Sequence, residues 1–381
     1  PPDPTEASAS IGGMVACNAS GARTYSYGAT RRYVAGLRVV LAGGDVLALR
    51  RGDPKTQGRA FKVATSTGRL IEGQVPAYQM PDVKSAAGYY AADNMDLLDL
   101  FVGAEGTLGV ISEIDLRLVP QPNAMWGVMS FFRSEAAAVG FVKKVRELET
   151  KPAAIEFFDH GALDLLRRQR ETSPAFKEIP EMPPVWHTAV YVEYNADTDV
   201  ELENAVMAMS ETMTECGGDG DATWLSTGEH EMERLKSFRH AVPEAVNLLI
   251  DERRKKEPGL TKLGTDLSVP DDSLDEVLAL YHAGLDKAGL EYVMFGHIGN
   301  NHLHVNIIPN TQADYDRGKA LYLEWARRVV EMGGSVAAEH GIGKLKKALL
   351  REMFGEEGIR QMQAAKACFD PEGRINPGNL F

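Results

Sequence analysis

One stretch carries three of the nine histidines and reads Phe295-Gly296-His297-Ile298-Gly299-Asn300-Asn301-His302-Leu303-His304-Val305-Asn306. Apolar residues lead into it, and its central Gly-Asn-Asn is typical of a turn, because glycine and asparagine tolerate a positive φ. After the turn, His302, His304 and Asn306 alternate with apolar residues, as the two faces of a strand require. The pattern predicts a β-hairpin whose polar face gathers imidazoles near its tip.

A second stretch, Glu339-His340-Gly341-Ile342-Gly343-Lys344, follows the small apolar run 335–338. If that run is extended, Glu339 and His340 point in opposite directions. Two imidazoles and one carboxylate are a common open-site set for Zn²⁺ or a similar divalent ion. Two histidines two apart on a strand are more often surface or hydrogen-bonded residues. The third histidine and the Glu-His pair favour a metal site.

The composition is that of a globular protein with more than one domain. The chain has 381 residues, of which 44% are hydrophobic and 25% charged, and this length allows two or three domains. A net charge of −13 argues against a nucleic-acid partner. The three cysteines lie far apart without a metal-type spacing, which favours a reducing, cytoplasmic setting. A membrane span needs about 18 consecutive apolar residues, and we expect none.

Two glycine-rich segments precede the histidine motif. Residues 10–21 are dominated by small side chains, which let the backbone approach a flat or anionic ligand closely. Residues 103–111 form a glycine-spaced loop that enters a predicted strand at 110–118. Either segment alone is also typical of a compact turn. Their occurrence together favours a shared ligand.

The rest of the chain alternates strand and helix patterns. We predict a hairpin at 34–50, strands at 126–132, 154–159 and 187–194, and helices at 93–102, 135–149, 161–171, 199–216, 229–250, 273–288 and 315–332. Gln121-Pro122-Asn123 is typical of a linker. The order predicts an α+β chain, with an antiparallel sheet in its second part that carries helices on one face.

Taken in order, these motifs and the ending 369–378 resemble the FAD-linked oxidases of the vanillyl-alcohol-oxidase superfamily. The most similar branch holds D-lactate dehydrogenase, the glycolate oxidase FAD subunit and D-2-hydroxyglutarate dehydrogenase. The resemblance implies part of a PCMH-type FAD-binding domain at 1–121, a substrate-binding cap domain at 122–357, and a segment at 358–381 that returns to the FAD domain.

The beginning of the chain differs from the family pattern. The family's Arg- and Gly-rich flavin-pyrophosphate loop is not found before Ser10, and the opening Pro1-Pro2-Asp3-Pro4 is typical of a loop within a protein. We therefore expect a longer protein of which this chain is a part.

The resemblance implies FAD and a divalent metal, with Zn²⁺ expected and Mn or Fe as alternatives. The metal ligands fall on His297, His304 and Glu339, and the general base falls on His340. The substrate contacts fall on Arg239, Lys262 and Asn306. The implied flavin contacts are Gly12, Gly13, Asn18, Ser20, Gly21, Gly28, Glu105, Gly106, Leu108, Gly109, Ile111 and Asn376.

The histidine motif departs from the family pattern His-x-Gly-Asp-Gly-Asn-x-His. Asn300, Asn301 and His302 stand where Asp, Gly and Asn are expected. His302 shares a strand face with His304, so it is a candidate fourth ligand or a partner of the ligands.

The resemblance implies oxidation of a small D-2-hydroxyacid to a 2-oxoacid, with a hydride passing to the flavin. The electron acceptor stays open between a quinone, an electron-transfer flavoprotein and an iron–sulfur subunit, and such a partner could bring the protein to a membrane surface. The oligomeric state also stays open, a homodimer included. Two other functions remain: a metal-dependent hydrolase, since the same donors activate water, and a flavin-free partner subunit of an oxidase complex.

Overall fold

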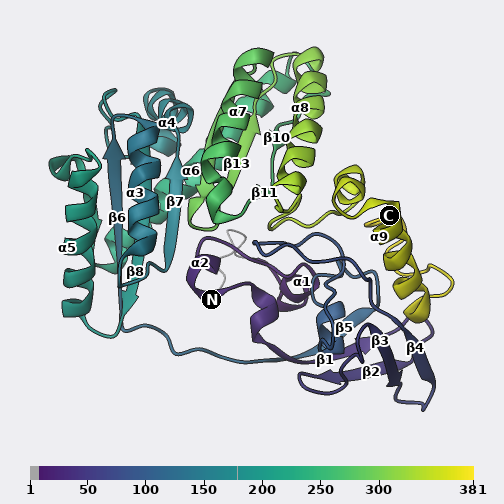
Figure 1. Ribbon diagram of the computed structural model, residues 1–381. Coiled ribbons are helices and arrows are strands. Elements are labelled where there is room, and N and C mark those ends of the chain that lie inside the picture. The colour runs from purple at the N-terminus through teal and green to yellow at the C-terminus, as the bar shows by residue number, and fades with distance from the viewer. Residues whose placement is uncertain (1–7, 178) are drawn as a thin grey trace.

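The computed structural model describes residues 8–177 and 179–381, and Figure 1 shows its arrangement. The predicted loop at Pro1–Pro4 lies outside the described residues, as does residue 178. The described residues form an eight-stranded sheet, a three-stranded sheet and a two-stranded sheet. The chain is thus of the mixed α+β class, as predicted.

The three-stranded sheet lies in the N-terminal part. Its central strand β1 (Val34–Val40) pairs antiparallel with β2 (Val46–Arg50) and β5 (Val110–Leu116), which confirms the hairpin at 34–50. Strands β3 (Ala60–Ala64) and β4 (Leu70–Gln74) form a separate hairpin. The helix expected at 93–102 is only a 3-10 turn, η2 (Leu97–Leu100), which is fully buried.

The end of the chain packs against this N-terminal part (Figure 1). Phe369, at the end of α9 (Lys347–Phe369), stacks on Phe61 of β3 with ring centroids 5.4 Å apart. The first small-residue segment, residues 10–21, contains the short helix α1 (Ile11–Ala16), and the short helix α2 (Thr24–Tyr27) follows it. The domain boundaries at 121 and 357 stay predictions.

The large sheet is antiparallel throughout, as predicted, with the strand order β10-β13-β12-β7-β8-β6-β9 and β11 beside β13. Its strands are β6 (Ala124–Phe132), β7 (Ala154–Phe158), β8 (Thr188–Ala196), β9 (Trp224–Ser226), β10 (Leu263–Gly264), β11 (Leu267–Ser268), β12 (Tyr292–His297) and β13 (His302–Ile307). The histidine hairpin β12–β13 therefore lies in a continuous sheet and not in an isolated loop.

Helices cover both faces of this sheet, so the prediction of helices on one face is wrong. Helices α3 (Glu135–Glu147) and α5 (Asp199–Glu215) pack on the face that holds Phe132 and Val192. Helices α4 (His160–Thr172) and α6 (Glu229–Arg254) pack on the face of Phe131 and Tyr191. The cause is that β6 and β8 bury apolar side chains in both directions, and an apolar face has to be covered.

Two further helices pack beside the hairpin (Figure 1). Trp325 of α8 (Gln312–Glu331) is fully buried against Tyr281 of α7 (Leu274–Ala288), with ring centroids 4.8 Å apart. Within the described ranges, no helix is both long and apolar enough to cross a membrane.

Candidate metal and substrate site

The hairpin aims its histidines at one point. His297 on β12 lies directly opposite His302 on β13, and Phe295 lies opposite His304. The short turn η6 (Ile298–Asn300) closes the hairpin, with Asn301 at φ +50°. Asparagine enters this left-handed region more readily than most residues. The predicted hairpin and its turn are therefore confirmed.

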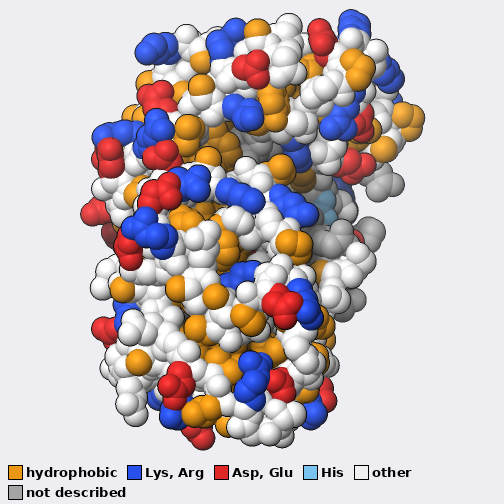
Figure 2. Space-filling model, turned by 90° about the vertical axis from the view of Figure 1, so that its right-hand side faces the viewer, with side chains coloured by type: hydrophobic (Ala, Val, Ile, Leu, Met, Phe, Trp, Pro, Cys, Tyr) orange, Lys and Arg blue, Asp and Glu red, His pale blue; other side chains and the backbone are white. Residues whose placement is uncertain are grey.

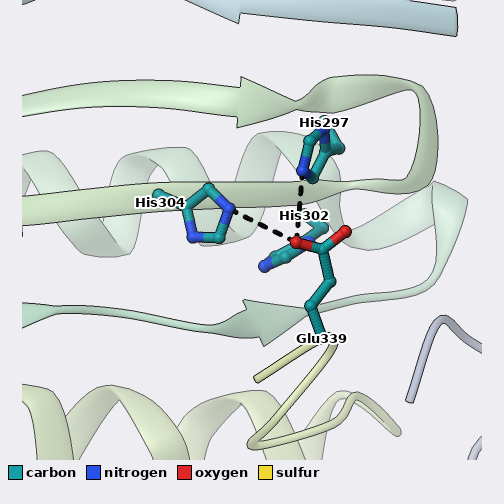
Figure 3. A group of neighbouring side chains, drawn as sticks. All are labelled: His297, His302, His304 and Glu339. Carbon is teal, nitrogen blue, oxygen red and sulfur yellow. Dashed lines mark ion pairs between the residues drawn. The ribbon is translucent and has the colours of Figure 1, made fainter. Parts of the chain in front are cut away.

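Glu339 reaches the imidazoles from the loop after α8 (Figure 3). Its Oε2 lies 3.2 Å from His297 Nε2 and 3.8 Å from His304 Nε2. One donor atom from each of His297, His302, His304 and Glu339 lies within 4.8 Å of the others. Imidazole and carboxylate donors that converge in this way suit Zn²⁺ and other first-row divalent ions. The residues fit the metal that the resemblance implies.

Partners behind the donors hold them in place. His297 Nδ1 lies 2.7 Å from Glu156 Oε1, so its N–H donates to that carboxylate and leaves Nε2 toward Glu339. The ammonium of Lys84 pairs with Glu339 Oε1. Sequence reasoning missed both partners, because Glu156 sits within the buried strand β7 and Lys84 within an irregular segment that carries no motif.

Asp266 shapes the Glu339–His340 turn. Its fully buried carboxylate accepts hydrogen bonds from the backbone N–H of Glu339 at 3.1 Å and of His340 at 3.0 Å. Lys346 Nζ donates to it at 2.7 Å, and His302 Nε2 lies 3.1 Å from it. Burial raises the pKa of Asp266, but the Lys346 ammonium and the neighbouring His302 and His340 outweigh burial and keep this pKa below its usual range. No motif or spacing in the sequence pointed to Asp266 as part of the site.

The buried charges balance one another. Burial opposes the charge on His297, but Glu156 and Glu339 outweigh it and raise the pKa of His297 to about 9. Burial also opposes ionisation of Glu339, yet His297 and Lys84 hold the pKa of its carboxyl well below the usual range. Burial lowers the pKa of His302 to about 4. At neutral pH the site thus combines an ionised carboxylate with a neutral His302.

The predicted metal, base and substrate residues all line one cavity of about 470 Å³. The structure brings together His297, His304, Glu339, His340, Arg239, Lys262 and Asn306 from four separate stretches of the chain. In Figure 2 a histidine side chain is visible toward the right of the view, about halfway up the molecule.

The cationic residues of the cavity have distinct surroundings. Arg239 Nη2 lies 3.6 Å from Glu156 Oε2, and the guanidinium lies 5.2 Å from the centroid of the Tyr191 ring. Burial lowers the pKa of Lys262. The imidazole of His340 lies in the same cavity and is exposed, and its ring stacks on His304 with centroids 5.3 Å apart.

A second cavity, of about 510 Å³, adjoins the first small-residue segment. It is lined by Asn18, Ser20 and Gly28, with Arg31 and Lys84 as basic side chains. Within the described ranges, the buried Oδ1 of Asn300 in this wall has no hydrogen-bond partner. Small walls, basic groups and an unused acceptor fit a flat, anionic cofactor that also carries donors.

The other predicted flavin contacts do not line this cavity, and several have packing contacts of their own. The Glu105 carboxylate accepts the backbone N–H of Ile342 at 2.7 Å and of Gly343 at 2.8 Å, and Asn376 Nδ2 donates to the Glu105 carbonyl at 2.9 Å. A Cβ on Gly109 would lie 2.5 Å from Val39. Flavin contact stays a prediction for Gly12, Gly13, Gly21, Glu105, Gly106, Leu108, Gly109, Ile111 and Asn376.

The protein thus has a mixed α+β fold with two cavities: one holds the metal-type donors, and the other has the small and basic walls that suit a cofactor. Comparison with protein families identifies the class of protein. The family described as "FAD linked oxidases, C-terminal domain" matches residues 121–380, and the family described as "FAD binding domain" matches residues 1–50. The chain therefore belongs to the FAD-linked oxidases.

Individual relatives fall in one branch of the family. The chain is 29% identical over its whole length to the glycolate oxidase subunit GlcD of Bacillus subtilis, of which it covers 70%. It is 31% identical over its whole length to a probable mitochondrial D-lactate dehydrogenase of Danio rerio, of which it covers 66%. It is 30% identical to the D-2-hydroxyglutarate dehydrogenase of Stutzerimonas stutzeri, which matches 98% of the chain and is itself covered to 70%.

A solved structure of alkyldihydroxyacetonephosphate synthase shares the fold, with a TM-score of 0.60 at 16% identity. The match covers 96% of this chain and 57% of that one. The chain thus spans roughly two thirds of the length of its curated relatives. It is homologous to FAD-linked 2-hydroxyacid dehydrogenases.

Proposed function

We propose that the protein is an FAD-dependent dehydrogenase of a small D-2-hydroxyacid, such as D-lactate, glycolate or D-2-hydroxyglutarate. The observation that carries this proposal is the single cavity where metal-type donors, His340 and the cationic Arg239 and Lys262 meet. A 2-hydroxyacid has a carboxylate for the cations and a neighbouring hydroxyl for the donors. The names of the relatives agree with this class of substrate.

Two bound groups would supply chemistry that side chains lack. His297, His304 and Glu339 would hold the divalent ion, for which Zn²⁺, Mn and Fe are the candidates; such an ion polarises a hydroxyl and lowers its pKa. Asn18, Ser20 and Gly28 would hold FAD, whose chemistry is to accept a hydride.

Substrate binding falls to Arg239 in this proposal. Its planar guanidinium can donate two hydrogen bonds to a carboxylate. Glu156 and the Tyr191 ring hold the guanidinium in position. Lys262 adds a second cation in the same cavity, and Asn306 adds an amide.

Proton transfer falls to His340. Its Nδ1 lies 3.8 Å from Asp266 Oδ1, which leaves Nε2 to accept the hydroxyl proton while C2 loses its hydrogen as a hydride. The product is then the 2-oxoacid. Because more than half of the His340 side chain is exposed, at 62%, the proton can pass to water.

The loop at 338–340 forms a wall shared by the two cavities. Ala338 lines the cavity beside the small-residue segment, whereas Glu339 and His340 line the cavity with the histidines. Ser20 Oγ, from the small-residue segment, lies 3.4 Å from Glu339 Oε1. This adjacency supports hydride transfer from a substrate in one cavity to an acceptor in the other.

The same proposal extends to the organisation of the chain. We assign residues 1–121 and 358–381 to the FAD domain and residues 122–357 to the cap domain. The electron acceptor would be a quinone, an electron-transfer flavoprotein or an iron–sulfur subunit.

An absorption spectrum of the purified protein tests the function. We expect flavin bands that bleach when D-lactate, D-2-hydroxyglutarate or glycolate is added without oxygen, and the acid that bleaches them identifies the substrate. Flavin bands that none of these acids bleaches would contradict the proposed substrate class. Bound metal without any flavin band would favour the metal-dependent hydrolase or the flavin-free subunit.

A further inference from the structure

His302 lies within the metal site although it is not one of the three ligands implied by the resemblance. Its side chain is fully buried, with 0% exposed. The centroid of its ring lies 4.4 Å from that of His304 and 5.4 Å from that of His297, and the other two rings are 5.5 Å apart. The three imidazoles thus form a nearly even triangle, and the Glu339 carboxylate reaches the same group of donors (Figure 3).

The protein surroundings do not satisfy this imidazole. Among the described residues, neither ring nitrogen of His302 has a hydrogen-bond partner. Nε2 lies 3.1 Å from Asp266 Oδ1, on a carboxylate that also accepts Lys346 and two backbone N–H groups, and this leaves Nδ1 as the nitrogen available to a ligand. A buried polar group without a partner is costly, because it has lost its hydrogen bonds to water and gained none in return. A buried imidazole in this position, where the family pattern has asparagine, therefore indicates a function as a donor to a ligand.

We propose that His302 is a fourth protein ligand, so that this chain holds its divalent ion with three imidazoles and one carboxylate. This inference rests on the proposed metal site and deepens it. A donor atom of His302 lies within 4.8 Å of donor atoms from His297, His304 and Glu339, as a shared ion requires. From the sequence alone, His302 was a candidate for either a fourth ligand or a partner of the ligands, and the geometry favours the fourth ligand.

The fourth ligand changes which ion suits the site. A tetrahedral Zn²⁺ with four protein ligands is a closed, structural centre. A six-coordinate ion such as Mn²⁺ keeps two positions for other donors. One of these positions would take the substrate hydroxyl, while the substrate carboxylate would stay with Arg239 and Lys262. We therefore expect the site to work with Mn²⁺ or Fe²⁺ in place of Zn²⁺.

The alternative is that His302 only supports the Asp266 carboxylate. In that arrangement His302 would not bind the ion, and its replacement would act through the Glu339–His340 turn. The two roles differ in the number of imidazoles around the ion, which X-ray absorption at the metal edge can count directly.

The experiment compares the wild-type protein with His302→Asn, which restores the family pattern at this position. Metal-free protein is titrated with Mn²⁺ and with Zn²⁺, and X-ray absorption is recorded on each loaded sample. We expect three imidazoles in the wild type, two in His302→Asn, and an Mn²⁺ affinity lowered about 10- to 100-fold, a range based on losses seen around metal sites. His160→Asn, a matched change outside the cavity, should leave the Mn²⁺ affinity unchanged.

Two imidazoles in the wild type would overturn the proposal and assign His302 to Asp266. Wild-type protein that binds neither ion would overturn it together with the proposed metal site. His302→Gln is the second variant if His302→Asn fails to fold, and the wild-type spectrum decides the question without either variant. Bleaching of the flavin by a hydroxyacid does not enter this experiment, so the two proposals fail separately.

Discussion

Among the residues that the structure describes, two places bring imidazoles close together, and one of them has the character of a metal site. The rings of His160 and His187 stack with centroids 4.6 Å apart, about as close as His302 and His304 at 4.4 Å. In the first pair each ring has a partner of its own: His160 Nε2 lies 3.0 Å from Asp164, and His187 Nδ1 lies 2.8 Å from Thr188 Oγ1.

The hairpin cluster differs in burial and in its shared carboxylate. Glu339 faces two imidazoles at once, and its side chain is only 8% exposed. The side chain of His160, in contrast, is 52% exposed. Proximity of imidazoles is therefore not enough for a metal site. A common anionic partner in a dry environment turns neighbouring rings into one set of donors, because charges interact more strongly where water is excluded.

Removal of the shared carboxylate has the largest expected effect. Glu339→Gln leaves Lys84 and His297 without their common counter-charge in a buried site. We expect the free energy of unfolding of the metal-free protein to fall by about 3–5 kcal/mol. We also expect the purified variant to lose its bound metal. Denaturant unfolding and elemental analysis measure the two effects, and a wild-type metal content would remove Glu339 from the ligands.

Lys84→Met tests the other half of this ion pair and has a smaller expected effect. The change leaves the Glu339 carboxylate beside His297 alone, which costs about 3 kcal/mol in the metal-free protein. A bound divalent ion supplies positive charge at the same carboxylate, so metal loading should recover most of the loss. Thermal unfolding with and without metal measures this difference. An equal loss in both states would show that Lys84 acts independently of the metal site.

Arg239→Ala tests whether the cavity beside the histidine cluster binds a carboxylate. A hydrogen bond to a charged group contributes about 1.5–3 kcal/mol, so kcat/KM should fall about 10- to 100-fold. Most of the change should appear in KM. Arg239→Lys keeps the charge but loses the planar fork, and we expect an intermediate value. Full turnover at an unchanged KM in the alanine variant would exclude this role.

A change in the stacked pair His160 and His187 has the smallest expected effect on stability. Burial and the neighbouring His160 lower the pKa of His187, so its protonation favours the unfolded chain. The wild type should therefore lose stability relative to His187→Gln as the pH falls below about 6.5. At pH 8 the pH-dependent part of the difference in free energy of unfolding between the wild type and His187→Gln should vanish. Urea unfolding at pH 5 and pH 8 measures it, and an unchanged metal content in His187→Gln would confirm the contrast with Glu339.

The sequence by itself determined the hairpin at 295–306, the antiparallel strands and which residues we predict as metal donors. These features depend on local patterns: alternation along a strand, turn residues that accept a positive φ, and histidines spaced on one face. Asn301 at the turn and the opposed His297 and His302 are where that pattern places them.

Only the tertiary structure decided which side chains support those donors. Lys84 and Glu339 are 255 positions apart in the chain yet form an ion pair, and Glu156 and Asp266 reach the site from other strands and loops. Local periodicity reports whether a residue points toward a core, but not which distant group it meets there. The same reason explains the helices on both faces of the large sheet, since the partners of each face come from segments far along the chain.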